Sequence, residues 1–360
     1  MPKEDLLFPE IEELSQKVER TTLPPELKEK IRRMIESLRR MAKFRTYTAE
    51  YESISRYVDL VTSLPWDRRT EDNLDLERAR KILDKNHYGM EIVKERILEY
   101  IAVLKLTQKE RGRKVEAVTG PLAVTRASVL CLVGLPGIGK TSVAYSIAGA
   151  VNRKFIRIAM GGMGSAVQLR GRSRAFPQAE PGQVIRGLSR AGSKNPVLLL
   201  DEIDRVADEA RTEVMGTLLE LLDPEQNAEF YDHYLDFPFD LSEVLFICSA
   251  NHTRNIANAV LDRLEVIQMP AYTDEKKEII GKDFLLPKAM EAYGLSREQL
   301  EIKDSLWPKI IRPLGYDAGI RTLERTIRGI CRKVAKGIVE GKVKKVVLSE
   351  KNIEEYLPRW

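Results

Sequence analysis

The spacing of apolar residues changes twice along the chain. Between residues 10 and 70 apolar positions recur at helical spacing, as at Leu27, Ile31, Ile35 and Leu38. This spacing puts the apolar side chains on one face of a helix. Pro65 favours a helix end just before it, because proline disfavours the helical conformation of the preceding residue. We therefore expect an N-terminal helical region over residues 1–72.

Residues 76–106 predict two more helices, separated at positions 87–89. The periodicity is lost over 107–128, where Gly112, Gly120 and Pro121 stand among charged and small residues. Such a stretch predicts a loop or an insertion.

The centre of the chain alternates short apolar runs with helical ones. The apolar runs are 129–133, 155–159, 197–200, 244–249 and 265–268. This alternation is typical of a parallel α/β sheet wrapped by helices. After Tyr272 the pattern is mainly helical, and Thr273 is a suitable N-cap. We expect an α/β domain over 73–271 and a small helical domain over 272–360.

Composition excludes several classes of protein. Hydrophobic residues make up 43% and charged residues 31% of the 360 positions, which favours a globular protein. No apolar stretch reaches the ~20 residues of a membrane span, so we expect no membrane partner. The acidic N-terminus lacks a signal-peptide pattern, and Cys131 and Cys248 lie inside strand-like runs as expected free thiols. These features indicate a reducing, cytoplasmic location. The net charge of +5 is spread along the chain and is a weak nucleic-acid signal.

The residues 134–141, Gly-Leu-Pro-Gly-Ile-Gly-Lys-Thr, fit the phosphate-loop pattern G-x-x-x-x-G-K-[ST] between a strand-like run and a helical one. We expect the backbone N–H groups of this loop to surround phosphate oxygens. Lys140 would reach the β- and γ-phosphates, and the hydroxyl of Thr141 would bind Mg²⁺. The nucleotide-binding residues that we assign to this segment are Gly134, Leu135, Pro136, Gly137, Ile138, Gly139, Lys140, Thr141 and Ser142.

Two adjacent carboxylates follow the strand-like run at 197–200. We expect Asp201 to hold the Mg²⁺ through water and Glu202 to polarise the attacking water. The alternative is a solvated helix start, but the order of the two motifs favours a nucleoside-triphosphatase that uses ATP and Mg²⁺.

The chain resembles an AAA+ ATPase, and more narrowly the ATPase portion of Lon protease. The resemblance runs from about residue 10 to the C-terminus. Five segments carry the resemblance. They are residues 84–100 without 91–92, residues 131–134 together with the phosphate loop, residues 194–204 without 197–198, the segment Leu221-Leu222-Asp223-Pro224-Glu225-Gln226-Asn227 together with residues 232–235, and residues 318–325. It implies an AAA+ P-loop fold with a parallel five-stranded sheet, preceded by an N-terminal helical region and followed by a small, mainly helical lid domain.

The resemblance implies roles for residues outside the two motifs. Asn251 is similar to the sensor-1 asparagine that orients water, Arg263 to an arginine finger that acts on a neighbouring subunit, and Arg321 to sensor 2. Tyr88 and Ile92 occupy the stretch that lines the adenine pocket in the family, and Phe176 matches the pore-loop aromatic that grips polypeptide. Each has an alternative: a turn residue for Asn251, a surface ion pair for Arg263, a helix cap for Arg321, core packing for Tyr88 and a packed loop anchor for Phe176.

Some segments depart from the family pattern. Pro177 follows Phe176 where the family usually has an aliphatic residue and then glycine, and residues 211–214 read Arg-Thr-Glu-Val instead of Arg-Gly-Asp-Pro. The Ser–Lys peptidase domain of the family would begin near Trp360, where this sequence ends. Either the sequence is a piece of a longer protein cut at this junction, or the natural protein lacks the peptidase; the abrupt end favours the first.

The function implied by the resemblance is ATP hydrolysis coupled to unfolding and translocation of unfolded or damaged protein substrates, within a self-associated ring, a hexamer in the family. One alternative is a nucleic-acid-acting AAA+ motor or loader, for which a basic patch with interleaved aromatic residues would be the sign. No such patch is evident in the sequence. A second alternative is a non-catalytic scaffold, against which the intact Lys140 and Glu202 argue.

Overall fold

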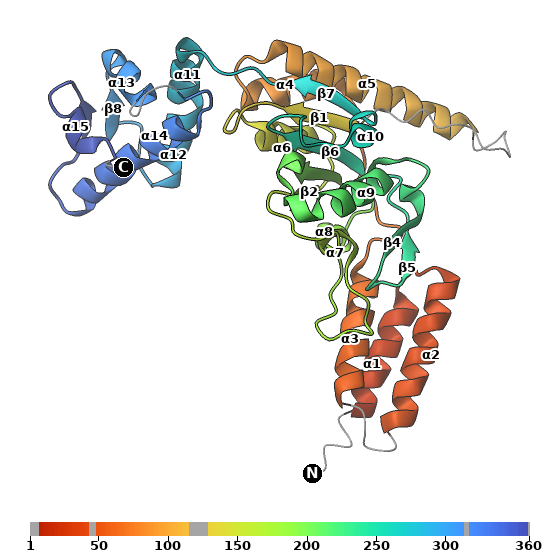
Figure 1. Cartoon of the computed structure of the whole chain (residues 1–360). Coiled ribbons are helices and arrows are strands. Elements are labelled where there is room, and N and C mark those ends of the chain that lie inside the picture. The colour runs from red at the N-terminus through yellow and green to blue at the C-terminus, as the bar shows by residue number, and fades with distance from the viewer. Residues whose placement is uncertain (1–6, 43–47, 115–128, 313–316, 359–360) are drawn as a thin grey trace.

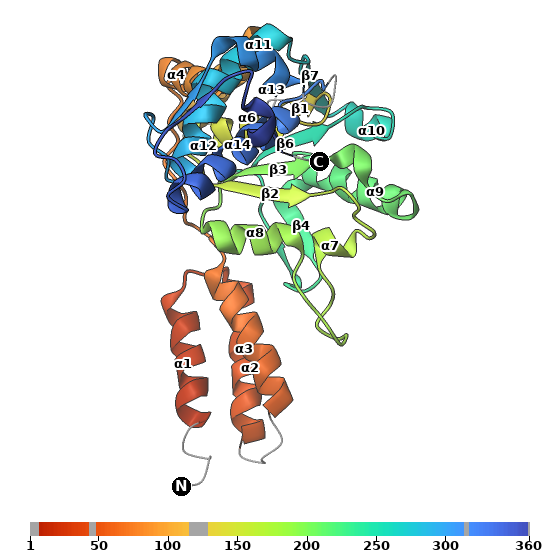
Figure 2. The ribbon, with the colours of Figure 1, turned by 90° about the vertical axis from the view of Figure 1, so that its left-hand side faces the viewer.

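The computed structural model describes residues 7–42, 48–114, 129–312 and 317–358, which form a helical bundle, an α/β domain and a C-terminal helical unit (Figures 1 and 2). The bundle consists of α1 (Leu7–Arg20), α2 (Pro25–Ala42) and α3 (Thr48–Ser63). The apolar face predicted over 27–38 is buried between these helices. The N-terminal helical prediction is therefore confirmed.

The α/β domain is built on a five-stranded sheet in which every pair of neighbours is parallel. In spatial order the strands are β2 (Phe155–Ala159), β3 (Val197–Asp201), β6 (Leu245–Ala250), β1 (Val129–Val133) and β7 (Leu264–Gln268). The parallel α/β prediction and all five apolar runs are confirmed. Because the carboxyl ends of parallel strands meet at one edge, the phosphate loop after β1 and Asp201 at the end of β3 lie at the same edge.

Helices cover both faces of this sheet. The helices of the domain are α4 (Leu76–Asn86), α5 (Glu91–Lys114), α6 (Lys140–Ala150), α7 (Val167–Arg170), α8 (Gln183–Ala191), α9 (Arg211–Leu222) and α10 (Asn258–Leu261). Side chains from α4, α5 and α6 share one hydrophobic core with one face of the strands. Side chains from α8, α9 and the N-terminal bundle share the other. The sheet is therefore buried on both sides, which explains why its strands are continuous apolar runs.

The expected loop over 107–128 is wrong for its first part. Helix α5 continues to Lys114, and residues 115–128 lie outside the described residues. Gly112 costs a helix only about 1 kcal/mol, and the neighbouring lysine, arginine and glutamate residues are good helix formers. The loss of apolar periodicity therefore signalled a helix without an apolar stripe, rather than a loop.

A small antiparallel hairpin joins the bundle to the α/β domain. It consists of β4 (Phe230–Asp232) and β5 (Phe237–Phe239). The buried hydroxyl of Tyr57 in α3 donates to the carbonyl of Leu235, 2.9 Å away. The ring of Trp66 lies 4.9 Å from that of Phe239. Strands of three residues are too short to produce a recognisable alternation, so the sequence did not predict this hairpin.

The C-terminal unit has a hydrophobic core of its own around Trp307. Its elements are α11 (Asp274–Ile279), a π-helical turn (Ile280–Leu285), α12 (Leu286–Ala292), α13 (Trp307–Ile311), α14 (Arg321–Val339), α15 (Ile353–Tyr356) and the paired parallel strands β8 (Leu300–Ile302) and β9 (Val346–Leu348). Thr273 caps α11 as predicted, since its side chain accepts the N–H of Lys276. The mainly helical prediction for this unit is confirmed.

A search of the described ranges finds no helix long and apolar enough to cross a membrane.

The packing of Gly281 against Trp307 gives a first prediction. A methyl group at Gly281 would clash with the ring of Trp307, which is buried. We expect Gly281→Ala to lower the free energy of unfolding by about 1–3 kcal/mol, because overpacking displaces a large core side chain. Denaturant unfolding followed by circular dichroism would measure this change.

Gly216→Ala is the matched control. Gly216 lies in α9, and nothing lies within 4 Å of a methyl group there. The same substitution should stabilise the protein by up to about 1 kcal/mol, since alanine favours helix. Equal effects of the two variants would contradict the packing argument.

Candidate functional site

The phosphate loop has the backbone geometry of an anion cradle. Gly137 and Gly139 have φ angles of 83° and 97°, which side chains other than glycine adopt only with strain. Ile138 between them is fully buried, so its side chain supports the loop from the core. Pro136, Gly137 and Gly139 instead line the cavity above the loop.

The ammonium group of Lys140 is held inside this loop. Its Nζ donates to the carbonyls of Gly134 at 2.6 Å and Leu135 at 3.2 Å, and to Oδ1 of Asn251 at 3.0 Å. Burial lowers the pKa of Lys140, and the attraction of Asp204 and other nearby carboxylates opposes this shift. Asn251 directly follows β6, so the structure brings the expected sensor-1 residue into contact with the phosphate-loop lysine.

The carboxylate of Asp201 is buried and fully engaged. Its Oδ2 accepts the hydroxyl of Thr141 at 3.1 Å, and its Oδ1 accepts the hydroxyl of Ser249. A hydroxyl beside a carboxylate suits Mg²⁺, which prefers oxygen ligands and usually keeps several of its waters. Thr141 and Asp201 therefore fit the expected metal. Among the described residues no group of three or more His, Cys, Asp or Glu could hold a metal ion.

Ser249 also positions Glu202. The backbone N–H of Glu202 donates to Oγ of Ser249 at 2.9 Å. Ser249 therefore connects both members of the acidic pair to β6. Sequence reasoning missed this role, although a hydroxyl within the apolar run of β6 is a readable signal, because buried hydroxyls need partners.

Glu202 adopts an unusual backbone conformation that turns its side chain into the cavity. Its φ is +61°, a left-handed value that costs a non-glycine residue about 1–2 kcal/mol. A methyl group at Gly161 would lie 2.8 Å from Oε2 of Glu202, so the glycine leaves room for the carboxylate. Arg205 is its ion-pair partner at 3.3 Å. Backbone strain of this kind is concentrated at functional sites.

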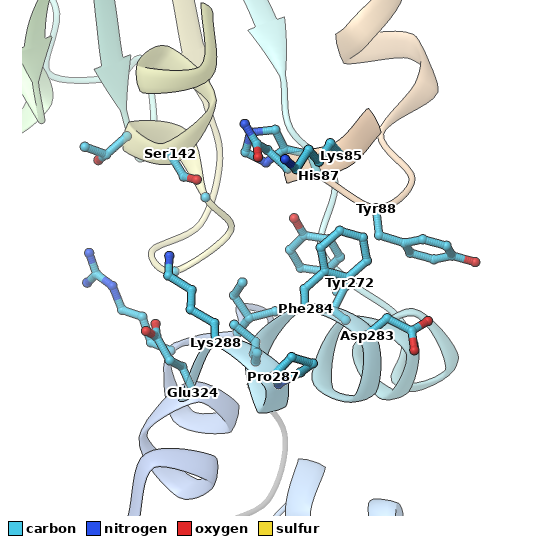
Figure 3. Close-up of a pocket in the computed structure, with 18 of the residues that line it drawn as sticks. Lys85, His87, Tyr88, Ser142, Tyr272, Asp283, Phe284, Pro287, Lys288 and Glu324 are labelled. Carbon is cyan, nitrogen blue, oxygen red and sulfur yellow. The ribbon is translucent and has the colours of Figure 1, made fainter. Parts of the chain in front are cut away.

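One end of the cavity is formed by the junction between α4 and α5. Tyr88 lines it, and its ring lies 6.5 Å from that of Phe284 in the C-terminal unit (Figure 3). His87 lines it too, although the sequence did not single it out. Its Nε2 lies 2.9 Å from Oγ of Ser146. Burial lowers the pKa of His87 to about 4, so the ring is neutral near pH 7.

The assignment of Ile92 to the adenine pocket is not supported by its position. Its side chain is 81% exposed and is not part of the cavity wall. Ile92 lies in the first turn of α5, whose buried side is formed by Val93, Ile97 and Ile101. One residue of helix corresponds to a rotation of about 100°, and this rotation places Ile92 off the side that Val93, Ile97 and Ile101 bury.

The C-terminal unit lies against the phosphate loop through its segment 319–321. The N–H of Ile320 donates to the carbonyl of Gly137 at 3.0 Å. A methyl group at Gly319 would lie 2.7 Å from the carbonyl oxygen of Pro136, so only glycine permits this approach. Arg321 begins α14 and lines the cavity beside Gly137. The expected sensor-2 residue is therefore in the site of its own chain.

Together these elements enclose a cavity of about 980 Å³. Such a volume is ample for a nucleotide, since small-molecule sites span roughly 300–1,000 Å³. Figure 3 shows the phosphate-loop helix on one side and residues of the π-helical turn and α12 on the other. Tyr272 connects the phosphate loop to the C-terminal unit, because its hydroxyl donates to the carbonyl of Ile138 at 3.1 Å and its backbone N–H donates to the carbonyl of Ala318 at 3.2 Å.

Arg263 and Phe176 lie outside the cavity wall, as do Ile92, Asn251, Gly134, Leu135 and Ile138. Arg263 pairs with Asp223 of its own chain at 2.8 Å, and its guanidinium lowers the pKa of that carboxyl group. Phe176 is 61% exposed in the loop between α7 and α8. Arg174 is the anchor of this loop, because its guanidinium lies 3.8 Å from the ring centroid of Tyr57.

Comparison with known proteins agrees with this architecture. Residues 130–271 match the family described as ATPase family associated with various cellular activities (AAA), and residues 291–347 match the Lon protease AAA+ ATPase lid domain. Lon protease 2 of Thermus thermophilus is 44% identical over 348 residues, which are 97% of this chain and 42% of that protein. Lon protease of Dictyoglomus thermophilum is 46% identical, over 97% of this chain and 42% of that protein. Lon protease 1 of Bacillus subtilis is 42% identical, over 97% of this chain and 43% of that protein.

The chain thus spans about two fifths of the length of these curated relatives. The matched AAA domain implies nucleotide binding at the phosphate loop. The two family matches in this chain cover a Lon-type lid as well as the AAA domain. The chain therefore belongs to the Lon protease family, of which it carries the AAA+ ATPase module and lid.

Proposed function

We propose that this chain is the ATP-hydrolysing module of a Lon-like ATP-dependent protease, which couples hydrolysis to unfolding and translocation of protein substrates. One observation carries the proposal. Lys140, Asp201 and Asn251 converge at the sheet edge beside the phosphate loop, and Glu202 lines the same cavity. This combination offers the groups that phosphoryl transfer needs: phosphate positioning, metal binding and activation of water.

Different residues of the chain have different roles in the proposed hydrolysis. Loop N–H groups and Lys140 bind the phosphates, and Tyr88 packs at the adenine end. The hydroxyl of Thr141 and, through water, the carboxylate of Asp201 would hold Mg²⁺, which would supply neutralisation of the phosphate charge. Glu202 accepts the proton of the attacking water, which Asn251 orients. Arg321 contacts the γ-phosphate from the lid.

We propose that Arg263 completes the site of a neighbouring subunit in a ring, a hexamer by analogy with the family. Its absence from the cavity wall of its own chain favours action between subunits. An arginine finger contributes roughly 10³–10⁵ in rate in related enzymes. This corresponds to about 4–7 kcal/mol of barrier, so an isolated subunit would bind ATP and hydrolyse it slowly.

We also propose that exposed Phe176 contacts unfolded or damaged protein substrates, and that the protein acts in the cytoplasm. We propose a division into residues 1–72, 73–271 and 272–360, with nucleotide binding in the second part and the lid in the third. The separate core of the C-terminal unit supports the boundary at residue 272, whereas the bundle shares one hydrophobic core with the sheet.

Substitution of Glu202 tests the hydrolytic proposal. We expect Glu202→Gln to bind ATP with unchanged affinity and to lose hydrolysis by about 10²–10⁴, since the amide cannot accept a proton. A phosphate-release assay on the assembled protein, with binding measured by fluorescent ATP analogue, would check this. Glu209→Gln is the control, because Glu209 is exposed and outside the cavity. Unchanged hydrolysis by Glu202→Gln would reject Glu202 as the base.

Substitution of Arg263 tests action between subunits. Arg263→Ala should retain nucleotide binding and lose hydrolysis, and its mixture with the Glu202→Gln variant should recover part of the activity. Mixed rings contain interfaces with an intact Glu202 on one side and an intact Arg263 on the other. Absence of any recovery, with mixed assembly shown by mass spectrometry, would count against this arrangement.

Substitution of Phe176 tests the protein-substrate proposal. We expect Phe176→Ala to reduce the stimulation of hydrolysis by an unfolded protein such as casein, with little change in basal hydrolysis. Phe176→Tyr retains an aromatic ring and should retain stimulation. Equal losses of basal and stimulated rates would indicate a packing role, and stimulation by DNA in place of casein would favour a nucleic-acid motor.

A further inference from the structure

Arg157 makes a contact in the metal-binding part of the site that neither nucleotide motif contains. It lies on β2, the edge strand of the sheet, next to β3. Its Nε donates to Oδ2 of Asp201 at 2.7 Å. The arginine side chain is 52% exposed, whereas the aspartate side chain is 4% exposed. A half-exposed cation therefore covers a buried carboxylate.

The contact occupies one oxygen of the carboxylate. Oδ2 of Asp201 also accepts the hydroxyl of Thr141 at 3.1 Å. A carboxylate oxygen has about two lone-pair positions, and these two donors fill both on Oδ2. Oδ1 accepts the hydroxyl of Ser249. A water bound to Mg²⁺ that approached Asp201 beside Thr141, on the side of Oδ2, would therefore compete with the guanidinium of Arg157 for this acceptor.

The positive charge of Arg157 also opposes the binding of Mg²⁺ beside Asp201. The positive charge of the Arg157 guanidinium lies within hydrogen-bond distance of the carboxylate that would attract Mg²⁺. Like charges at such distances repel strongly where solvent is partly excluded. Before the ion arrives, however, the same charge compensates the buried carboxylate of Asp201, which would otherwise be costly to bury.

We infer that Arg157 is a positioning residue that occupies the metal side of Asp201 until Mg²⁺ displaces it, and that it thereby sets the Mg²⁺ concentration at which the site binds nucleotide. This inference rests on the proposed function, because it concerns the Mg²⁺ and nucleotide of the same site. Exposure of Arg157 at the sheet edge leaves the side chain room to swing into solvent when the ion binds.

Lys140 differs from Arg157 in this respect. The ammonium of Lys140 contacts neutral acceptors, two carbonyls and an amide, and it meets the phosphates directly. Loss of Lys140 would therefore weaken nucleotide binding with or without metal. Loss of Arg157 should alter only the dependence on metal.

The experiment is a Mg²⁺ titration of mant-ADP fluorescence with the full chain. We expect Arg157→Met to lower the Mg²⁺ concentration at half-maximal binding by about threefold to tenfold, in line with the loss of a charge-assisted hydrogen bond. The affinity for mant-ADP in EDTA should not change. Arg157→Lys keeps the charge and should give an intermediate midpoint. Arg190→Met is the control, because Arg190 is an exposed arginine on α8.

The outcomes separate this inference from the proposed function. An unchanged or raised midpoint for Arg157→Met overturns it, and so does a loss of affinity in EDTA, which would make Arg157 a phosphate ligand. If unaltered protein fails to bind mant-ADP at any Mg²⁺ concentration, the proposed function itself is wrong. Should Arg157→Met not fold, the ¹⁵N signal of Nε of Arg157 in unaltered protein decides: it should shift when Mg²⁺ is added to the mant-ADP complex, and a static signal overturns the inference.

Discussion

The ammonium group of Lys140, enclosed by the glycine loop, connects the parts of the site. It donates hydrogen bonds to the carbonyls of Gly134 and Leu135, which follow β1, and to the amide oxygen of Asn251, which follows β6. The ends of β1 and β6 therefore contact the same ammonium group. Burial makes this charge costly unless acceptors surround it. The loop can therefore close only where the neighbouring strand supplies Asn251, and the sheet order places β6 directly beside β1.

A second constraint is the close approach of the lid to the phosphate loop. Gly319 and Gly137 bring two backbones into contact without side chains between them, and Ile320 hydrogen-bonds the loop. Arg321 follows immediately, so its position depends on this backbone contact. The phosphate loop and the start of α14 are therefore connected through main-chain atoms, without intervening side chains.

Large parts of the fold could be predicted from the sequence. The five strands were readable because strands covered on both faces are continuous apolar runs, and the cap at Thr273 because capping is a local interaction. The length of α5 and the hairpin β4–β5 were not readable. Helix α5 extends over charged residues that carry no apolar stripe, and the hairpin strands are too short for a pattern. The assignment of Ile92 to the adenine pocket was not supported for another reason. A motif identifies the segment that lines a pocket, but not the direction in which one side chain of that segment points.

The sequence alone determined the phosphate loop, the acidic pair and the order of strands and helices, because these depend on residue type and local spacing. The tertiary structure alone decided that Ser249 connects both carboxylates, that His87 lines the cavity as a neutral ring, and that Arg157 covers Asp201. These contacts join residues 44 to 59 positions apart. Only the pairing of strands and the packing of α4 against α6 bring such residues together, and neither leaves a local signal in the sequence.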